Sequence, residues 1–408
     1  MLFTGIDWSD QDLEFELRTG DGEVLEAGEV ETSPEGMVEL FARLDRHAPA
    51  HQIAIAIEAT RAAWIQSLLD HGYAVYPLHP ASVDSFRKAR SAAGHKSDKI
   101  DRRVIAMYLA TFHADLRQLR PDDPEIVALR IACEDRLRLI EERTARLNEL
   151  TALLKQYCPV FSGLFGVLNS RIALEFLQEF PTQDQMRQLS ERKLQNWLKR
   201  HGYTHRSRLG KMIVQLQGPA MPVTGHHQAA KAPHLQFLAR SLLSLNEEID
   251  RRDRMINEQL NGLPEADWVR SLPGVGKVLG PAILAVIGRD PARFNSPEEA
   301  GGLVGTAPVT IASGRSKQVR FRRGCWKFAR RTFQLLADQS RLAGCTWVVA
   351  LYERLRAAKR GHHEALRVIA NRWLKIILAM KRTGSRYDEA LFLQSRARYL
   401  SKGKADPT

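Results

Sequence analysis

The sequence predicts an α/β domain followed by two mainly helical regions, and three patterns support this order. Short apolar runs alternate with helical patterns over residues 1–120, as in α/β folds. A long pattern with an apolar residue every seven positions follows, which is typical of coiled-coil helices. Helical patterns joined by glycine-rich turns fill the last third of the chain. We therefore expect an α/β domain over 1–120, a helical coiled-coil linker over 121–262, a mainly α domain over 263–390 and a basic tail over 391–408.

The elements of the first domain follow from its apolar pattern. The runs LFTGID at 2–7 and IAIAIE at 53–58 have the short apolar character of buried strands. Between them, two alternating runs flank the turn GDG and predict a β-hairpin, and Thr32 with Glu35 fits a capping box before the next helix. The rest of the domain is expected to hold a helix from about residue 61, the strand YAVYPL, a short helix near 83 and a helix that begins in the motif SDKID.

Four acidic residues stand at the ends of these elements. Asp7 and Glu58 end the two apolar runs, and Asp98 and Asp101 lie three apart at the start of the SDKID helix. Sites form at strand ends in open sheets, and side chains at positions i and i+3 of a helix face the same way, so the four carboxylates can converge. Two divalent ions about 4 Å apart promote phosphodiester chemistry, and Mg²⁺ prefers oxygen ligands. The set therefore predicts a two-metal magnesium site.

Two long helical arms are expected in the middle of the chain. In the first arm, from about 125 to 157, Ile126 begins a row of apolar residues that recur every seven positions. Arg136 and Arg143 interrupt the second apolar row of this helix. The second arm is expected from about 234 to 260, after a loop rich in glycine, proline and small residues. The arms can pair within one chain or between two chains, so the pattern fits either a dimer contact or simple bundle packing.

The net charge of +13 indicates a polyanionic partner, for which nucleic acid is the usual candidate. The charge is uneven, because residues 313–408 hold 23 Lys and Arg against 6 Asp and Glu, whereas the rest of the chain holds 37 against 41. Four scattered cysteines without CxxC spacing favour reduced thiols over disulfides or a zinc site. Since we find no targeting signal and no apolar run of the ~20 residues that cross a bilayer, we expect a cytoplasmic protein without a membrane partner.

A glycine-rich turn and a basic segment are the candidates for nucleic-acid contact. The turn SLPGVGKVLG resembles a helix-hairpin-helix turn, whose backbone N–H groups bind a phosphate, although a tight connection between helices explains the same glycines. In the segment 315–331, eight basic residues and no acid stand among aromatic residues that can stack on bases or pack in a core. The residues expected to contact nucleic acid are Gly274, Gly276, Lys277, Arg315, Lys317, Arg320, Arg322, Arg323, Lys327, Arg330 and Arg331.

Ser313 stands before Gly314 at the start of the basic segment. A hydroxyl among guanidinium groups can attack a phosphodiester, because the arginines offset the charge that develops in the transition state. A Ser-Gly pair is also a common turn. Composition alone therefore leaves both interpretations open.

The motifs GID, IEAT, SDKIDRRVIA, LPGVG, GLVGTAP and SGRSKQVRFRRG occur in this order along the chain, within a resemblance that covers about residues 3 to 385. This ordered set resembles the DEDD transposases of the IS-one-ten insertion-sequence family, whose relatives include the Piv-type DNA invertases. The resemblance implies a RuvC-like first domain of ribonuclease H fold, a coiled-coil linker and a C-terminal transposase domain. The chain departs from the family pattern at two places beside the acids. Trp8 and Asp10 follow GID, where the family often has a smaller residue and a lysine, and Arg102 follows the last Asp of SDKID, where a small residue is common.

Carried over residue by residue, the family's acidic tetrad falls on Asp7, Glu58, Asp98 and Asp101, and its nucleophilic serine falls on Ser313. The resemblance implies a recombinase that exchanges DNA strands through a transient phosphoserine link, with two Mg²⁺ ions and no nucleotide cofactor. Its implied partners are double-stranded target and donor DNA, a structured non-coding bridge RNA that guides the enzyme, and further copies of the chain in a dimer or tetramer. The implied setting is the bacterial cytoplasm.

Three other functions remain open. The acids alone fit a RuvC-like endonuclease that resolves DNA junctions, and the basic surface alone fits a non-enzymatic nucleic-acid-binding scaffold. An actin-like sugar kinase or ATPase also begins with a GID-type strand. That class needs glycine-rich phosphate loops in both halves, and the α/β part of this chain has no second loop of this kind.

Overall fold

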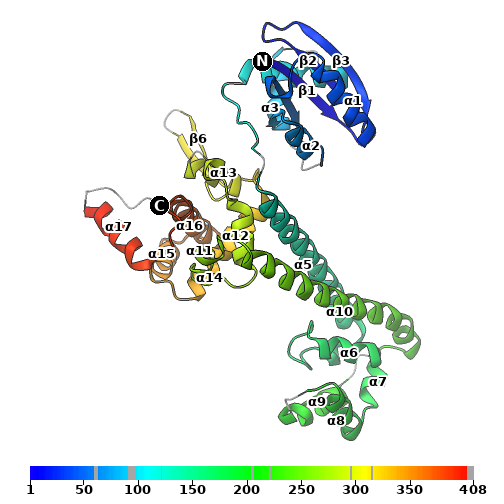
Figure 1. Cartoon of the computed structure of the whole chain (residues 1–408). Coiled ribbons are helices and arrows are strands. Elements are labelled where there is room, and N and C mark those ends of the chain that lie inside the picture. Colours follow the sequence, from blue (N-terminus) through cyan, green and yellow to red (C-terminus); the bar gives the residue numbers. More distant parts are fainter. Residues whose placement is uncertain are drawn as a thin grey trace. The chain divides into compact units, whose positions relative to one another are not determined.

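The computed structural model describes residues 1–58, 63–90, 98–120, 122–203, 206–219, 222–294, 296–313 and 316–401. The chain divides into two compact units, Met1–Asp122 and Asp123–Thr408 (Figure 1). Within the described ranges, no helix is long and apolar enough to cross a membrane.

The first unit is built on a five-stranded mixed sheet. Its strands are β1 (Leu2–Trp8), β2 (Asp12–Arg18), β3 (Val24–Glu31), β4 (Ile53–Glu58) and β5 (Ala74–Leu78). The strand order is β3-β2-β1-β4-β5. The pairs β3–β2 and β2–β1 are antiparallel, and the pairs β1–β4 and β4–β5 are parallel. The prediction of an α/β domain with a hairpin around GDG is therefore confirmed.

The helices of the first unit are α1 (Pro34–Asp45), α2 (Ala63–His71), α3 (Pro80–Arg90) and α4 (Asp98–Phe112), with a 3-10 turn at Ala50–Gln52. The start of α1 differs from the expected capping box. Ser33, and not Thr32, caps the helix, because the Ser33 hydroxyl accepts a hydrogen bond from the Gly36 N–H at 3.1 Å. Thr32 instead donates its hydroxyl to the Ser9 carbonyl at 3.0 Å, which ties it to the β1–β2 connection.

Side-chain alternation along the strands gives the sheet two different faces. On one face, Ile6 and Ile55 belong to a cluster of large apolar residues that α1 and α2 cover. On the other face, β4 presents Ala54 and Ala56, and α4 packs there through residues such as Leu109. The alternation of isoleucine with alanine in β4 thus suits both faces of the sheet. The isoleucines pack in the larger apolar cluster, and the small alanine side chains let α4 lie close to the sheet.

Two long helices cross the middle of the second unit, α5 (Pro124–Tyr157) and α10 (Gly225–Asn261). They pack against each other within one chain, as Figure 1 shows. Arg136 of α5 forms an ion pair with Asp253 of α10, and Arg143 donates to the Asn246 Oδ1 atom at 3.3 Å. Because these two arginines interrupt the predicted apolar seam, polar contacts between the helices replace apolar ones at those positions.

The first residues of α10 lie in a segment that was predicted to be a loop, so that prediction is wrong there. The helix begins at Gly225, well before the expected start near residue 234, and the Thr224 side chain caps it. The buried Gln228 holds the first turn by accepting from the Asp184 N–H at 3.1 Å. Pro233 therefore lies inside the helix, where a proline costs about 3 kcal/mol. The burial of apolar residues along the same helix offsets that cost.

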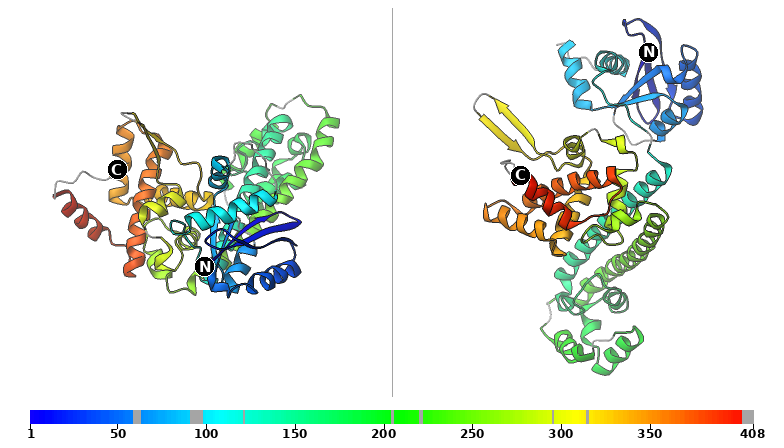
Figure 2. Two further views of the ribbon diagram at one scale, coloured as in Figure 1. Left: turned by 90° about the horizontal axis from the view of Figure 1, so that it is seen from above. Right: turned by 60° about the vertical axis from the view of Figure 1, so that its left-hand side comes forward.

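A group of short helices packs on the end of α5 and the start of α10 and has a core of its own (Figure 2). Trp197 is buried among several phenylalanine rings in this core, and its indole N–H donates to Glu179 at 2.5 Å. The helices are α6 (Arg171–Glu179), α7 (Gln183–Arg187), α8 (Glu191–Arg200) and α9 (Leu209–Gln217), with 3-10 turns at Pro159–Phe161 and Arg206–Arg208.

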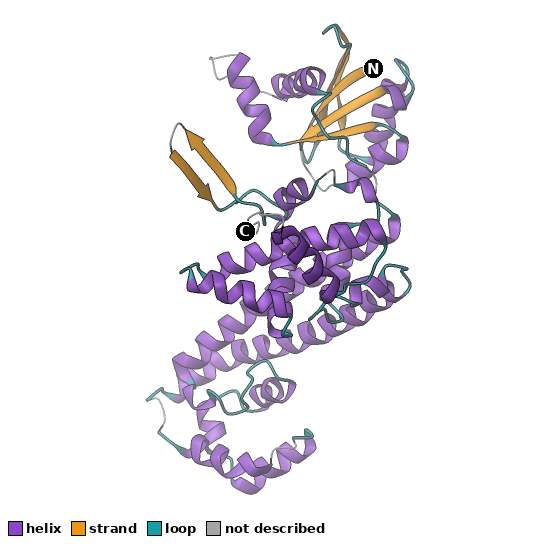
Figure 3. Ribbon diagram, turned by 90° about the vertical axis from the view of Figure 1, so that its left-hand side faces the viewer, coloured by secondary structure: helices purple, strands orange, loops and turns teal. Residues whose placement is uncertain are grey.

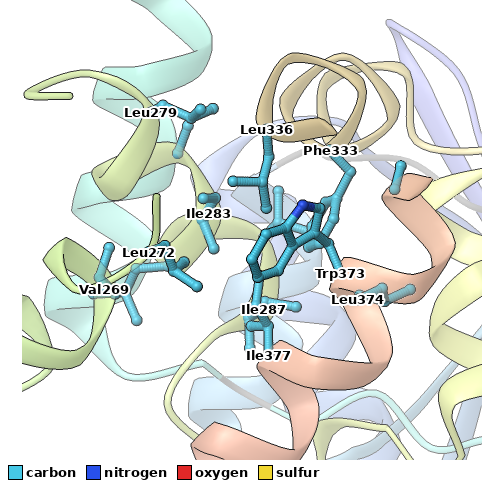
Figure 4. Close-up of a cluster of buried hydrophobic side chains, with 14 of the residues drawn as sticks. Val269, Leu272, Leu279, Ile283, Ile287, Phe333, Leu336, Trp373, Leu374 and Ile377 are labelled. Atoms are coloured by element: carbon cyan, nitrogen blue, oxygen red, sulfur yellow. The ribbon is translucent and has the colours of Figure 1, made fainter. Parts of the chain in front are cut away.

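The C-terminal helices form a larger core at the other end of α5 and α10. They are α11 (Ala266–Arg270), α12 (Leu279–Ile287), α13 (Pro297–Val304), α14 (Lys327–Leu342), α15 (Thr346–Ala357), α16 (His362–Thr383) and α17 (Glu389–Ser401), with a 3-10 turn at Pro291–Arg293. Figure 4 shows the Trp373 indole among Phe333, Leu336 and Ile377. Its N–H donates to the Ser340 hydroxyl at 2.9 Å, so the buried polar atom is satisfied.

A two-stranded antiparallel hairpin interrupts these helices. Its strands are β6 (Val309–Ser313) and β7 (Ser316–Arg320), and Figure 3 shows it standing away from the helices of its unit. Apolar residues on both strands are exposed, including Ile311 and Val319. A mainly α region was expected here, and the hairpin was not predicted. Its signal in the sequence was two five-residue runs separated by the pair Gly-Arg.

Candidate functional site

The direction of α4 decides where the acids of its first turn lie. The Phe3 ring, near the start of β1, meets the His113 ring just after α4, with centroids 5.4 Å apart. Further along β1, a Cβ atom on Gly5 would come within 2.2 Å of the Ala106 backbone nitrogen. α4 therefore runs antiparallel to β1, and its N-terminal turn reaches the end of β1 that carries Asp7.

Asp7 and Glu58 occupy the same end of two adjacent parallel strands. The β1–β4 register pairs the residues directly before the two acids. Asp7 lies two residues beyond Gly5, and Glu58 lies two residues beyond Ala56, so strand alternation turns both acids to the face that α4 covers. Both residues are partly exposed.

Asp98 and Asp101 lie in the first turn of α4, as predicted. The Asp98 side chain lies outside the described residues. The Asp101 side chain is 16% exposed, and its carboxylate accepts a hydrogen bond from Arg87 of α3 at 3.3 Å. Arg87 also donates to Asp84 at 2.5 Å, and the hydrogen bond with Asp84 raises the pKa of the guanidinium. One cation therefore serves two carboxylates.

The backbone gathers the predicted acids at one end of the sheet, while Arg87 occupies the Asp101 carboxylate. Among the side chains that the structure describes, no three His, Cys, Asp or Glu residues form a group that could hold a metal ion. Acidic residues gathered at one end of a sheet are nevertheless a donor set that suits Mg²⁺. The role of these acids as metal ligands stays a prediction.

Arg102, which departs from the expected family pattern, has a role in packing. Its guanidinium forms an ion pair with Glu14 of β2, and both side chains are largely buried. It also donates to the Gly28 carbonyl of β3 at 3.0 Å. Arg102 thus ties α4 to the antiparallel half of the sheet.

Ser313 is the last residue of β6, where it pairs with Ser316 of β7. Its side chain is exposed. Gly314 and Arg315, which connect the strands, lie outside the described residues. An exposed hydroxyl at this end of the hairpin is accessible to a DNA strand, so it meets the first requirement of a nucleophile.

The two glycines of the LPGVG turn have different surroundings. Gly274 has a φ angle of +73°, and a Cβ atom there would lie 2.5 Å from the Gln339 carbonyl of α14, so this glycine is needed for packing. A Cβ atom on Gly276 would meet open space, and Lys277 is exposed. The second half of the turn is therefore accessible to a ligand, and phosphate contact there stays a prediction.

Two family models match the chain. The model for DEDD transposases of the IS110 type, described as "Transposase", matches residues 4–159, which include the sheet and its acids. A second model, described as "Transposase IS116/IS110/IS902 family", matches residues 266–353, which include the LPGVG turn and the hairpin. The chain belongs to the IS110/IS116/IS902 family of transposases.

Curated relatives cover this transposase almost from end to end. It is 25% identical to the insertion element IS900 uncharacterized 42 kDa protein of Mycobacterium paratuberculosis, over 95% of this chain and 98% of the relative. It is 26% identical to the mini-circle putative transposase for IS117 of Streptomyces coelicolor, over 95% of each chain. Over 61% of each chain, it is 31% identical to the insertion element IS116 uncharacterized 44.8 kDa protein of Streptomyces clavuligerus.

The basic segment of the transposase contains both accessible and structural cations. Arg320, Arg323, Lys327 and Arg331 are exposed, and Arg331 also pairs with Glu141 of α5 at 3.2 Å. Partly buried arginines in the segment instead donate to backbone carbonyls. Arg322 reaches the Ala307 carbonyl at 3.2 Å, and Arg330 reaches the Arg322 carbonyl at 2.5 Å. Arg315 and the side chain of Lys317 lie outside the described residues.

The structure also separates the aromatic residues of this segment. Phe328 is buried in the C-terminal core, and the Trp326 indole donates to Glu134 of α5 at 2.9 Å. Phe321 is 45% exposed. The first two therefore pack within the transposase, and Phe321 is the aromatic side chain of the segment with the most accessible surface.

Sequence reasoning missed two residues that shape the surroundings of the acids, Gly5 and Arg87. Gly5 carried a signal, because a glycine inside an apolar strand often marks a close backbone approach. Arg87 carried none, because its partner Asp101 reaches it only through the packing of α3 against α4.

Proposed function

We propose that this transposase breaks and rejoins DNA strands through transient attachment to Ser313, with Mg²⁺ held by Asp7, Glu58, Asp98 and Asp101. The observation that carries the proposal is the antiparallel course of α4, which takes the first-turn acids to the ends of β1 and β4. Like charges gathered at one sheet end repel one another unless a cation offsets them. A divalent ion supplies that charge.

The metal-binding part of the proposal rests on donor chemistry. When bound there, Mg²⁺ would stabilise the negative charge that develops on an attacked phosphate. Arg87 donates one hydrogen bond to Asp101 and has Asp84 as a second partner. The carboxylate of Asp101 can therefore turn toward a cation without leaving the guanidinium of Arg87 unpaired.

Ser313 would perform the covalent step. Its Oγ atom would lose its proton and attack the phosphorus of a phosphodiester, so that a P–Oγ bond forms and one P–O ester bond of the strand breaks. The departing DNA oxygen takes up a proton, so no proton is gained or lost overall. Attack by a DNA hydroxyl on the phosphoserine would reverse the step and return the proton. The number of ester bonds is conserved, so strands can be exchanged without ATP.

Guide RNA and oligomerisation complete the proposal. The family resemblance supports a structured RNA that selects target and donor DNA by base pairing. Strand exchange between two duplexes requires at least two copies of the active serine, which supports a dimer or tetramer. The basic C-terminal quarter would contact phosphates.

A covalent-adduct assay tests the serine. The full chain is incubated with labelled DNA that carries its native flanking sequences, together with its RNA and Mg²⁺, and the products are separated on a denaturing gel. We expect an adduct with the native chain and with Ser316→Ala, which removes the paired hydroxyl on the opposite strand. Ser313→Ala should give none. Cleavage by Ser313→Ala without an adduct would instead favour a junction-resolving endonuclease.

The RNA partner is tested separately. The chain is purified from cells that carry its native flanking DNA, and the RNA that accompanies it is sequenced. We expect one abundant structured transcript from beside the gene. Random cellular RNA would remove the guided part of the proposal and leave the serine chemistry in place.

A further inference from the structure

A cavity of about 600 Å³ lies at the base of the β6–β7 hairpin. The loop Gly305–Pro308, which leads into β6, forms one side of it, and the end of β7 with the following residues forms the second. Side chains from the α15–α16 region close it. The cavity therefore adjoins the element that carries Ser313.

The cavity has an excess of positive charge. Four guanidinium groups line it, and Glu364 is the one carboxylate among the lining residues that the structure describes. Glu364 already pairs with one of the four, Arg360. Burial lowers the pKa of Arg367, Glu364 opposes that shift, and the nearby Arg330 adds to it. An anion inside the cavity would reduce the electrostatic repulsion among these guanidinium groups. The four lining arginines are Arg320, Arg322, Arg360 and Arg367.

The ring of Phe321 contacts one of these four cations, Arg367, and also Arg330, which lies beside the cavity. The Arg367 guanidinium carbon lies 4.7 Å from the ring centroid, and that of Arg330 lies 4.5 Å from it. Arg330 is held further by the Arg322 and Arg323 carbonyls. The guanidinium groups of Arg330 and Arg367 are therefore held in place before any ligand arrives, which lowers the entropy lost on binding.

The remaining wall is apolar with one polar pair. Pro308, Leu355 and Val368 line the apolar part. At the back, the Thr306 hydroxyl donates to the Asn371 side-chain oxygen at 3.0 Å. An ordered set of cations beside an apolar wall is complementary to a nucleotide, which joins an anionic phosphate to a flat base with apolar faces and a polar edge.

We infer that this cavity takes one unstacked nucleotide of a DNA strand, with its phosphate on Arg360 and Arg367 and its base against Leu355 and Val368. The choice of DNA rests on the proposed function. A base within a duplex stack would meet only the rim of such a cavity, so the strand has to be locally opened. Val319 is the lining residue of β7 nearest to the hairpin end, and three residue steps separate its pair with Thr310 from the Ser313–Ser316 pair, so Ser313 lies roughly 10 Å from the cavity rim. The cavity would hold the strand within about four nucleotides of the attacked phosphate.

Binding measurements test this inference. Fluorescence anisotropy with the full chain at fixed ionic strength would use a labelled ten-nucleotide oligothymidylate and a strand of equal length made of abasic units. Arg367→Gln and, independently, Arg360→Gln should weaken binding of oligothymidylate about tenfold, because each removes a charge-assisted contact. Arg240→Gln, which removes an exposed charge from α10, is the matched control and should change it twofold or less.

A second variant tests the base. Val368→Trp fills the apolar part of the cavity and leaves its four arginines in place. It should weaken oligothymidylate binding to the level of the abasic strand and leave abasic binding unchanged. An unchanged thermal midpoint would show that each variant is folded.

Three results would overturn the inference. The arginine variants could bind like Arg240→Gln, the native chain could bind the abasic strand as tightly as oligothymidylate, or a ten-nucleotide oligouridylate RNA could bind more tightly than the DNA. The proposed function fails by a different route. Loss of the covalent adduct concerns Ser313, and Ser313→Ala should bind oligothymidylate as the native chain does.

Discussion

The sheet unit and the β6–β7 hairpin present their candidate groups in opposite ways. Asp7 and Glu58 stand at the ends of strands whose other residues are almost all buried, and α4 packs on Gly5 backbone to backbone. Ser313 stands on a two-stranded hairpin whose described side chains are nearly all exposed. One group of residues is held by a core, and the other is displayed to solvent.

The difference follows from the chemistry expected of each group. Carboxylates that share a cation repel one another without it, so a rigid scaffold has to hold them together. A hydroxyl that attacks a phosphate must reach a bulky strand, which favours an accessible position over a buried one. The packing of the two regions is thus consistent with their proposed roles.

The largest effect is expected at the acids. Asp7→Asn keeps the size of the side chain but removes a charge that Mg²⁺ needs, so recombination of a reporter plasmid should fall roughly a thousandfold, equivalent to about 4 kcal/mol. Asp10→Asn, on the exposed turn after β1, is the control and should stay near the native rate. Equal recombination activity of Asp7→Asn and the native chain would contradict a metal-binding role for Asp7.

A smaller effect is expected on the scaffold. Gly5→Ala puts a methyl group 2.2 Å from the Ala106 nitrogen, which a packed helix backbone cannot avoid, so the free energy of unfolding of the first unit should fall by about 3 kcal/mol. In the matched variant Gly20→Ala, the new methyl group would meet the Phe3 ring at an ordinary 3.7 Å. Chemical denaturation of the two variants provides the measurement, and equal losses would contradict the close approach of α4.

Hydrogen exchange would sharpen the contrast between core and hairpin. A two-stranded hairpin without a covering layer is marginally stable, so backbone amides of β6 and β7 should exchange at least about a hundredfold faster than those of β1 and β4. Mass spectrometry of exchanged peptides resolves the two regions. Similar protection in both would mean that the hairpin is covered in solution.

The smallest effect is expected at Arg87. Its guanidinium competes with a metal ion for Asp101, so Arg87→Gln should lower the Mg²⁺ concentration for half-maximal activity by about threefold. Lys88→Gln is the control: it removes a neighbouring charge of the same helix that pairs with Asp84, and it should leave the Mg²⁺ requirement unchanged. A higher requirement in Arg87→Gln would mean that Arg87 orients Asp101 for the metal.

Local pattern was enough to predict most elements of the first unit and the first long arm. Alternation around GDG predicted β2 and β3, and IAIAIE predicted β4, because side chains in a strand with two different faces must repeat every two residues. The start of α4 at Asp98 also agreed with the motif SDKID. These predictions depended on neighbours close in sequence.

Predictions failed where distant contacts outweighed local preference. Pro233 indicated a loop, but the packing of α10 into a helical core keeps it inside a helix. The aromatic residues of the basic segment looked alike, yet Phe328 is buried and Phe321 is exposed. Trp326 contacts α5 and Phe321 contacts α16, and both helices are far away along the chain.

The sequence by itself determined which residues could do chemistry: four carboxylates at element ends, and a serine before a run of arginines. Tertiary structure decided their setting, because only the antiparallel passage of α4 over Gly5 takes Asp101 to the end of β1 that carries Asp7. The physical reason is that residue type and spacing fix the charge and the periodicity of a segment. The direction of one segment across another depends on which surfaces can pack closely, and that is a property of the folded chain.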